Sequence, residues 1–524
     1  MESRKVFVLF IIIFSLHLTN ANGKFKKYNK MFKKFEAKSA KSSQPNILFI
    51  LSDDHGYRDV GYHGSLFDTP VLDEMAAKGV KLENYYVQPI CSPTRSQLLT
   101  GRYQIHTGLQ HAVLQPTAPA CLPTDEITLA QKMKEAGYAT HMIGKWHMGF
   151  YEEACLPNNR GFDTYLGLLL GGGYHFTHSF PTPQYYDFHK DCSAAKEYNG
   201  TYSTYAMTDR AIDIINNQDG DKPFFMYLAY QAPHAPLEVP EQYKDPYRST
   251  FKDDDNRLTY AGMVSCLDEG VGNVTAALKA KGLYDNTVII FSSDNGGSIQ
   301  DGGNNWPLRG CKLSMFEGGM RAIGFVHSPL LSDNVKGTVS NELYHVSDWF
   351  PTFVEGIAGW NTDGTKPLDG FNQWESIRDG TASCRTELLH NIDPLWVVPG
   401  GRDWVRELSP FNISINAALR HGDWKIVTGD NGETGWIAPP DTGYETIPGP
   451  TTDQVTWLFN VTGDPLEQND LSCERPDILA WMLKKLQKYY LDSVPVIYPP
   501  TQVLNADPCI NGNDCVWGPW TPIN

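Results

Sequence analysis

After residue 21 the sequence has no apolar run long enough to cross a membrane, which takes about 20 consecutive apolar residues. The first apolar run, Val6–Leu18, is too short for a membrane span. It follows Arg4 and Lys5 and ends near small residues, which is typical of a secretory signal peptide. We therefore predict a signal peptide over residues 1–21. The mature protein is expected to be exported and not transmembrane, with the lysosome and the extracellular space both open as destinations.

Positive charge is scarce: 44 Lys and Arg residues face 60 Asp and Glu residues, which gives a formal net charge of -16 at pH 7. Such a chain does not attract nucleic acid by bulk charge, so we expect no nucleic-acid partner. The exception is segment 24–41, where eight lysines accompany a single glutamate. We predict that residues 22–44 form a basic linker; the alternative is an arm that binds membranes or anionic glycans.

Ten cysteines are too few for a disulfide scaffold at this length, but they suit several disulfides in an oxidising compartment. If Cys91 is set aside, nine remain, so at least one of them is unpaired or intermolecular. We predict the pairs Cys121 with Cys155 and Cys509 with Cys515, because each pair brackets a segment that can close. Four Asn-x-Ser/Thr sequences agree with passage through the secretory pathway. The predicted glycosylation sites are Asn199, Asn273, Asn412 and Asn460.

Continuous apolar runs at residues 46–52 (NILFILS) and 286–293 (NTVIIFSS) predict buried parallel strands. Other short runs alternate with helical patterns such as those at 129–136 and 205–216. Alternation of strand and helix predicts the α/β class, with helices on both faces of a sheet.

A second region follows a loop-like stretch, residues 383–401. It contains short runs with turn signals at 416–427 and 457–464, followed by an amphipathic helix over Pro476–Leu491. We predict a small antiparallel sheet with one helix packed on it. The chain would then divide into residues 45–399 and 400–524.

Polar pairs end the two apolar runs: Asp53 and Asp54 follow the first, and Asp294 and Asn295 follow the second. Polar site residues of α/β sheets gather at the carboxyl ends of strands. Three carboxylates and an amide oxygen suit Ca2+ or Mg2+ better than zinc. A single such pair would more often be a turn or a helix cap, but the two pairs together favour a metal site.

Cys91 opens the stretch CSPTRSQLLTG, which predicts a short helix with Pro93 in its first turn and Gly101 at its end. The cysteine then lies at the positive end of that helix, where backbone N–H groups can meet an anion. Arg95, one turn further on, can reach back to the same place. From these residues alone, Cys91 could be a redox partner, a metal ligand, a nucleophile or a small buried residue.

Four further basic residues follow predicted strands. Lys145 and His147 alternate at the end of one strand, His234 lies between prolines in QAPHAP, and Lys312 lies in a glycine-flanked turn. Each residue alone would be interpreted as solvent-facing or locally satisfied. Their shared placement after strands favours one common site.

These sequences resemble the sulfatase family. CSPTRSQLLTG is similar to the signature C-x-P-x-R with a glycine-ended helix, and GYATHMIGKWH is similar to the second signature of the family. The similarity covers most of the chain and is closest to the branch of arylsulfatase B (N-acetylgalactosamine-4-sulfatase) and arylsulfatases I and J. It implies an alkaline-phosphatase-like sandwich: a catalytic domain over 45–399 with a large, mixed, mostly parallel sheet flanked by helices, and a smaller C-terminal domain over 400–524.

The resemblance also implies that Cys91 is converted to formylglycine by the formylglycine-generating enzyme. The hydrated aldehyde would attack sulfur with one hydroxyl, and collapse of the second would expel sulfate. One divalent cation, Ca2+ rather than Mg2+, would complete the site. Its implied ligands are Asp53, Asp54, Cys91, Asp294 and Asn295.

Roles for the basic residues follow from the same resemblance. Lys145 and Lys312 would bind the sulfate oxygens, and Arg95 would hold the nucleophile in place. His234 would protonate the leaving oxygen, and His147 would act as the base that assists sulfate release.

The identity of the substrate is the least constrained expectation. Residues 166–202 are glycine- and aromatic-rich and depart from arylsulfatase B, and Cys192 lacks the partner found there. An N-acetylgalactosamine-4-sulfate-type glycan, an aryl sulfate, and a dietary or defensive sulfate ester remain open, with Tyr174, His175 and Trp306 as candidate pocket residues. The alternatives are a hydrolase of phosphate or phosphonate esters, and a catalytically silent secreted homologue that binds glycans. Since every residue of the expected site is present, the silent homologue is disfavoured.

Overall fold

The computed structural model describes residues 44–182, 184–218, 222–430, 435–440, 442–449 and 454–521. The predicted signal peptide and nearly all of the predicted basic linker lie outside these residues. No helix in the described ranges is both long and apolar enough to span a membrane.

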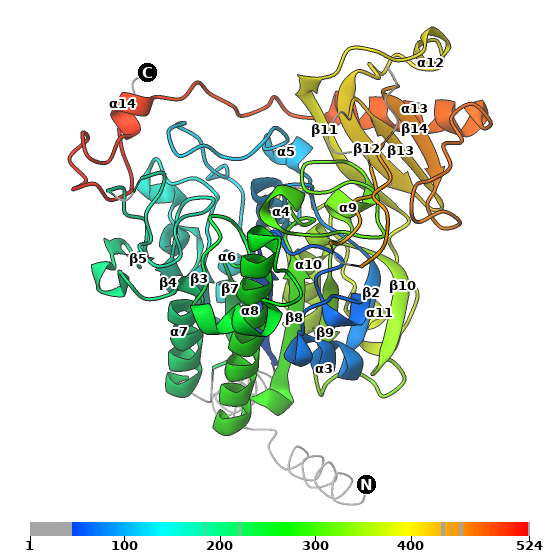
Figure 1. Ribbon diagram of the computed structural model, residues 1–524. Coiled ribbons are helices and arrows are strands. Elements are labelled where there is room, and N and C mark those ends of the chain that lie inside the picture. The colour runs from blue at the N-terminus through cyan, green and yellow to red at the C-terminus, as the bar shows by residue number, and fades with distance from the viewer. Residues whose placement is uncertain are drawn as a thin grey trace, which may run out of the picture. The chain divides into compact units, whose positions relative to one another are not determined.

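A ten-stranded sheet lies at the centre of the described part of residues 45–524 (Figure 1). Its strand order is β10-β2-β9-β8-β1-β7-β3-β4-β5-β6. The bounds are β1 Asn46–Ser52, β2 Val80–Tyr86, β3 Ala139–Gly144, β4 Thr164–Gly167, β5 His189–Lys190, β6 Ser193–Ala194, β7 Phe224–Ala229, β8 Thr287–Ser293, β9 Gly324–His327 and β10 Thr338–His345. Strands β8, β1, β7, β3 and β4 run parallel to their neighbours in that series, while β9, β5 and β6 pair antiparallel. The sheet is therefore mixed and mostly parallel, as predicted.

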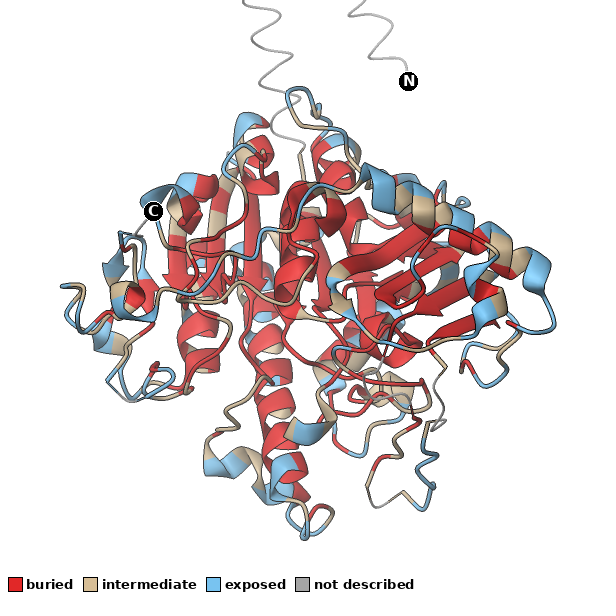
Figure 2. Cartoon of the chain, turned by 90° about the horizontal axis from the view of Figure 1, so that it is seen from above, coloured by how far each residue is buried: buried red, intermediate tan, exposed pale blue. Residues whose placement is uncertain are grey.

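Strand β1 is buried along its whole length because helices cover both faces of the sheet (Figure 2). Leu48 and Ile50 pack in one cluster with side chains of α3, α7 and α8. Ile47, Phe49 and Leu51 pack on the other face, with side chains of α4, α6 and α10. The bounds of these helices are α3 Pro70–Lys78, α4 Cys91–Thr100, α6 Leu129–Glu135, α7 Ser203–Asn217, α8 Asp255–Lys281 and α10 Trp349–Pro351. A continuous apolar strand fits this two-sided burial.

A second, four-stranded antiparallel sheet has the order β11-β12-β13-β14. Its strands are β11 Glu387–Val397, β12 Ile415–His421, β13 Trp424–Thr428 and β14 Thr456–Asn460, and α13 spans Pro476–Asp492. Leu479, Leu483 and Leu486 of α13 pack in one cluster with Leu419 and Leu458 of the sheet. The small sheet with its packed helix thus has the predicted form.

Strand β11 corrects one interpretation, because residues 387–397 were expected to be loop. The strand is irregular: its register with β12 shifts between Leu389 and Asn391 and again between Asp393 and Val397, around Pro394. Proline and register shifts are tolerated in a strand at the edge of a sheet. They interrupt the regular alternation of side chains by which a strand is recognised in the sequence. The small sheet therefore begins before residue 400, where the second domain was predicted to start.

The C-terminal segment returns from α13 to the main sheet (Figure 1). Val494 N donates to Ile105 O at 2.8 Å, and Trp517 N donates to Tyr186 O at 2.9 Å. The remaining short helices are α5 Gln104–Thr107, α9 Glu317–Met320, α11 Trp374–Asp379, α12 Asp403–Arg406 and α14 Val503–Ala506. The structure forms the disulfides Cys121–Cys155 and Cys509–Cys515.

Candidate active site

The carboxyl ends of β1 and β8 bring the two polar pairs into contact. Ser52 and Ser293 are register partners, so the residues that follow them meet. Asp54 N donates to Asp294 Oδ1 at 3.1 Å, and Asn295 Nδ2 donates to Asp54 Oδ1 at 2.7 Å. The predicted carboxylate cluster is therefore assembled, and its members are buried.

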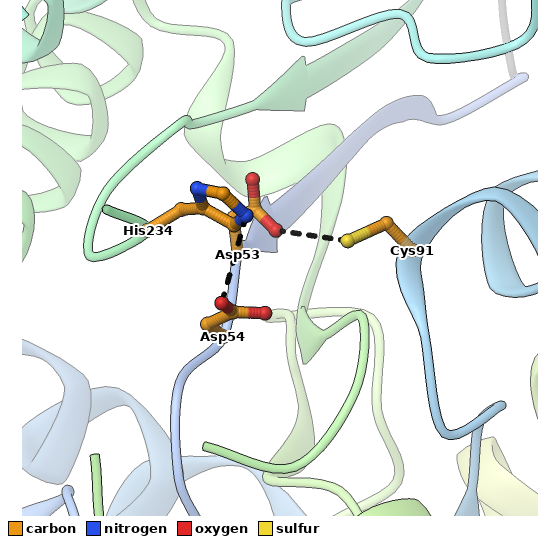
Figure 3. A group of neighbouring side chains, drawn as sticks. All are labelled: Asp53, Asp54, Cys91 and His234. Atoms are coloured by element: carbon orange, nitrogen blue, oxygen red, sulfur yellow. Dashed lines mark hydrogen bonds and ion pairs between the residues drawn. The ribbon is translucent and has the colours of Figure 1, made fainter. Parts of the chain in front are cut away.

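The cluster fits a divalent cation with oxygen ligands. Asn295 Oδ1 is buried and has no hydrogen-bond partner among the described residues, so an oxygen is left over for a further contact. One potential ligand atom from each of Asp53, Asp54, Cys91 and His234 lies within 4.8 Å of the others (Figure 3). Two of these four atoms are carboxylate oxygens, and Asp294 and Asn295 add further oxygens beside Asp54; such hard donors suit Ca2+ or Mg2+.

Helix α4 begins at Cys91, as predicted, and each of its residues is buried. Gly101 ends it in the left-handed conformation, with φ of 67° and its N–H donating to Gln97 O at 2.8 Å. The Cys91 thiol lies 3.6 Å from Asp53 Oδ1. Burial raises the pKa of Cys91 to about 12, whereas cysteines that act as nucleophiles have a lowered pKa.

Each of the three carboxylates is paired with a cation, and Arg95 Nη2 also lies 3.7 Å from Asp53 Oδ1. The nitrogen–oxygen pairs are Arg95–Asp294 at 2.8 Å, Lys145–Asp53 at 2.6 Å and Lys312–Asp54 at 2.6 Å. Arg95 also donates from Nη1 to the carbonyl oxygen of Lys145 at 2.9 Å, which ties α4 to the end of β3. Segments far apart in the sequence thus supply three cations and three carboxylates, all buried except Lys312, whose side chain is 17% exposed.

The carboxylates differ in their protonation because their neighbours differ. Burial raises the pKa of Asp53 to about 8, and the charge of Asp294 adds to this. Burial also acts to raise the pKa of Asp54, but Lys312, His234 and Lys145 together outweigh it and bring the pKa of Asp54 below its usual range. Close carboxylates in a dry site repel one another, which favours a bound cation.

His147 and His234 line a cavity together with Cys91. His234 Nε2 lies 3.7 Å from Asp54 Oδ2. Burial lowers the pKa of His234 to about 3 and brings that of His147 well below its usual range, with Lys145 adding to the effect at His147. Both rings are therefore neutral in this state, and each has a ring nitrogen that can accept a proton.

A glycine run contacts both histidines, and the sequence analysis missed it. A Cβ atom on Gly171 would overlap the His147 ring, and one on Gly172 would lie 3.0 Å from His234 Cε1. Only glycine lets the backbone approach the two rings this closely. The signal was the triple glycine within residues 166–202, which was noted without being assigned a role.

The cavity above Cys91 has a volume of about 250 Å³. Cys91, His147, His234 and Lys312 form its reacting end. Its wall is mainly apolar and includes Leu114, Pro116, Phe150, Leu170 and Phe180. One polar end and one apolar wall suit a substrate with an anionic group on an uncharged body.

The predicted pocket residues lie elsewhere. Among the described residues, the lining of this cavity does not include Tyr174, His175 or Trp306. His175 is buried and its Nε2 lies 3.0 Å from the carbonyl oxygen of His234, so it supports that loop from behind. Trp306 instead stacks on Tyr444, with ring centroids 5.3 Å apart.

Buried carboxylates paired with three cations, next to a cavity that two histidines line, are typical of a hydrolase that acts on esters of a tetrahedral oxyanion. A family model described as Sulfatase matches residues 45–357. The chain belongs to the sulfatase family.

Individual relatives agree with this assignment. The chain is 49% identical over 496 residues to arylsulfatase J of Mus musculus, covering 93% of this chain and 82% of that protein. It is 30% identical over 379 residues to N-acetylgalactosamine-6-sulfatase of Homo sapiens, covering 68% of this chain and 70% of that protein. The crystal structure of Ps i-CgsB with k-i-k-neocarrahexaose superposes with a TM-score of 0.72 at 30% identity, covering 87% of this chain and 94% of that chain. The protein is a sulfuric ester hydrolase of the arylsulfatase type, and the resemblance to sulfatases is confirmed.

Proposed function

We propose that this enzyme hydrolyses sulfate esters through a formylglycine derived from Cys91, assisted by one divalent cation, Ca2+ rather than Mg2+. The observation that supports this most is that the carboxylate cluster and its three cations lie directly behind a cavity that Cys91 and Lys312 line. The hydrated formylglycine supplies the hydroxyl nucleophile and the cation polarises a sulfate oxygen. The proposed cation ligands are Asp53, Asp54, residue 91, Asp294 and Asn295.

The basic side chains bind and orient the sulfate group. Lys312 lines the cavity, and Lys145 lies beneath it against Asp53, so the two ammonium groups can contact different sulfate oxygens. Arg95 is wholly buried and held by Asp294 and the Lys145 carbonyl, which suits it to fix residue 91 and not to bind substrate directly.

The two histidines exchange protons at opposite stages. His234 has its Nε2 near Asp54 in the cavity and, once it has taken up a proton, would give it to the leaving oxygen. His147 lies beside residue 91 with its Nδ1 unpaired among the described residues, and would accept a proton during sulfate release. Such positioned proton transfers each contribute about 100- to 10,000-fold.

The substrate we propose is an N-acetylgalactosamine-4-sulfate-type glycan or an aryl sulfate. The apolar wall, with Leu114, Phe150 and Phe180, can pack against the flat face of a sugar or aryl ring. The names of relatives support a sulfated glycan: one is an N-acetylgalactosamine-6-sulfatase, and another was solved with neocarrahexaose.

We also propose that the protein passes through the secretory pathway and is lysosomal or secreted. Three of its four candidate glycosylation sites, Asn199, Asn273 and Asn412, are exposed, and Asn460 is half-buried. The formylglycine-generating enzyme would be its partner during biosynthesis.

The direct experiment is the mass of the tryptic peptide that ends at Arg95 and contains residue 91. Conversion of the thiol to the aldehyde lowers this mass by a fixed amount, and the converted fraction should track specific activity with an aryl sulfate. A fully active protein whose peptide carries an unmodified thiol would contradict the proposal. A matched aryl phosphate serves as the control for the phosphate-ester alternative and should be hydrolysed far more slowly.

A further inference from the structure

The segment of residues 309–317, here called the Lys312 segment, joins the active site to the small sheet. On the active-site side, Lys312 Nζ lies 2.6 Å from Asp54 Oδ2. Lys312 N donates to Gly297 O at 3.3 Å, and Leu313 N donates to Pro89 O at 2.8 Å. Pro89 lies just before helix α4, so one side of the segment contacts the site directly.

Residues of the small-sheet region hold the other side of the Lys312 segment. Gly310 N donates to Gly435 O at 2.7 Å. Met315 N donates to Asp430 Oδ2 at 2.5 Å, and Asp430 lies two residues after the end of β13. These two bonds fall on either side of Lys312 in the sequence, so the small-sheet region brackets the lysine.

A buried charge cluster fixes the end of the same segment. Glu317 N donates to Glu467 Oε2 at 2.7 Å. Lys425 Nζ, from β13, lies 2.9 Å from Glu317 Oε1 and 2.8 Å from Glu467 Oε1, with all three side chains 0% exposed. Removing one partner of a buried ion pair costs far more than the net contribution of the pair. The cluster therefore holds α9 in one position against β13.

The simplest alternative is that these contacts only attach the small sheet to the rest of the protein. An apolar interface already does so: Met315 and Phe316 pack in one cluster with Val427, Trp457 and Phe459. Apolar packing is not directional, whereas bonds to the N–H groups of residues 310, 315 and 317 fix where each backbone atom lies.

The backbone beside Lys312 needs such anchoring. Leu313 has φ of 78°, a conformation that is strained for a leucine and persists only where the surroundings impose it. The bond from Leu313 N to Pro89 O on one side, and the bonds to Gly435 and Asp430 on the other, supply that constraint.

We propose that Asp430, Lys425 and Glu467 are positioning residues, which set the location of the Lys312 ammonium group through the backbone of the Lys312 segment. The small sheet is then part of the sulfate-binding apparatus. This inference rests on the proposed role of Lys312 in binding a sulfate oxygen.

A double-mutant cycle between Asp430 and Lys312 tests the inference in the full-length enzyme. Asp430→Ala removes the acceptor for Met315 N, so kcat/KM for an aryl sulfate should fall by about 10- to 100-fold, the usual cost of misplacing a binding group by about 1 Å. The inhibition constant for inorganic sulfate should rise with it. In a Lys312→Ala background the same change should alter kcat/KM by less than about twofold, because the residue it positions is already gone. Asp430→Asn, which keeps a carbonyl oxygen in place, should restore most of the activity.

Asp470→Ala is the matched control. Asp470 also accepts a backbone N–H within the small-sheet region, from Leu458 at 3.1 Å, but it does not bond to the Lys312 segment in the described structure. Its loss should lower stability without raising the sulfate inhibition constant. Equal losses from both aspartate variants, or additive losses in the Lys312→Ala background, would overturn the inference.

Two further variants distinguish failure of this inference from misfolding and from failure of the proposed role of Lys312. If Asp430→Ala does not fold, Glu467→Gln provides the same cycle, since it keeps the shape of the side chain while removing the charge paired with Lys425. If Lys312→Ala itself keeps full activity, the proposed function of Lys312 fails, and the inference falls with it. Normal activity of Lys312→Ala is thus distinguishable from a cycle that is merely additive.

Discussion

Arg95 holds Asp294 with two nitrogens: Nη2 and Nε lie 2.8 Å and 3.2 Å from the same carboxylate oxygen. Both side chains are 0% exposed. Two charge-assisted hydrogen bonds to one oxygen fix both partners, and they join helix α4 to the end of strand β8.

We therefore expect Arg95→Ala to destabilise the enzyme by about 3–5 kcal/mol, since it leaves a buried carboxylate without its partner. Denaturant unfolding of the purified variant measures this loss. The matched control is Arg210→Ala, because Arg210 pairs with the exposed Asp213 at 2.7 Å and should cost less than about 1 kcal/mol. Equal costs for the two variants would show that the Arg95 pair is not the structural tie described above.

Gly171→Ala should lower kcat while leaving the fold intact. The added methyl group overlaps the His147 ring, which is the end of a side chain and can move aside. Displacing a residue that transfers a proton should reduce kcat by about 100-fold. Gly173→Ala is the control, because the nearest atom to its added Cβ is Ser179 O at 3.4 Å, an ordinary contact. Steady-state assays with an aryl sulfate measure kcat, and thermal melts show whether the fold has lost stability. An unchanged kcat in Gly171→Ala would refute the role of the glycine run.

Removal of the divalent cation should lower thermal stability as well as activity. The buried carboxylates repel one another, and an added cation that binds only the folded state stabilises it by about 2.7 kcal/mol at a hundredfold excess over its dissociation constant. We expect EGTA treatment to lower the melting midpoint and Ca2+ to restore it. Asn295→Ala, which removes the unpaired buried oxygen, should weaken Ca2+ binding measured by calorimetry. A melting midpoint that changes with neither EGTA nor Ca2+ would contradict metal binding at this cluster.

The stability of the enzyme should depend on pH through His106. Its Nδ1 lies 2.7 Å from Asp369 Oδ2, and its Nε2 lies 3.5 Å from Asp492. Burial and Arg102 lower the pKa of His106, but the hydrogen bond and charge of Asp369 outweigh them and raise it above 6.5. A raised pKa in the folded state means that the contribution to stability is complete below 6.5 and is lost as pH rises through the folded-state pKa.

The difference in unfolding free energy between the native enzyme and His106→Gln should therefore shrink as pH increases above neutrality. Urea unfolding of both proteins across a pH series measures it. A difference that grows with pH would show that the histidine is not held in its charged form.

Sequence reasoning reached the strand ends and helix α4 because their signals are local. The run NILFILS and the pair after it specify a buried strand and its polar end, and parallel pairing then places Asp53 next to Asp294. Proline and glycine in CSPTRSQLLTG similarly mark where α4 begins and ends. The sequence was sufficient to predict an element where the residues of one short segment determine its structure.

The features that were missed depend on partners far away in the chain. Strand β11 contains Pro394 and two register shifts, so it reads as a strand only when β12 is beside it. Nothing in the local sequence of Glu467 or Asp430 indicates that each accepts a backbone N–H from the Lys312 segment. Trp306 was expected to face substrate, but it stacks on Tyr444, a contact between distant loops.

The depth at which Cys91 lies sets the time at which its chemistry can happen. Its side chain is 2% exposed, and the strands that enclose it include β8, which is made nearly two hundred residues later. An enzyme that has to grip the chain on both sides of this thiol would therefore need to reach it before the end of β8 has folded against helix α4.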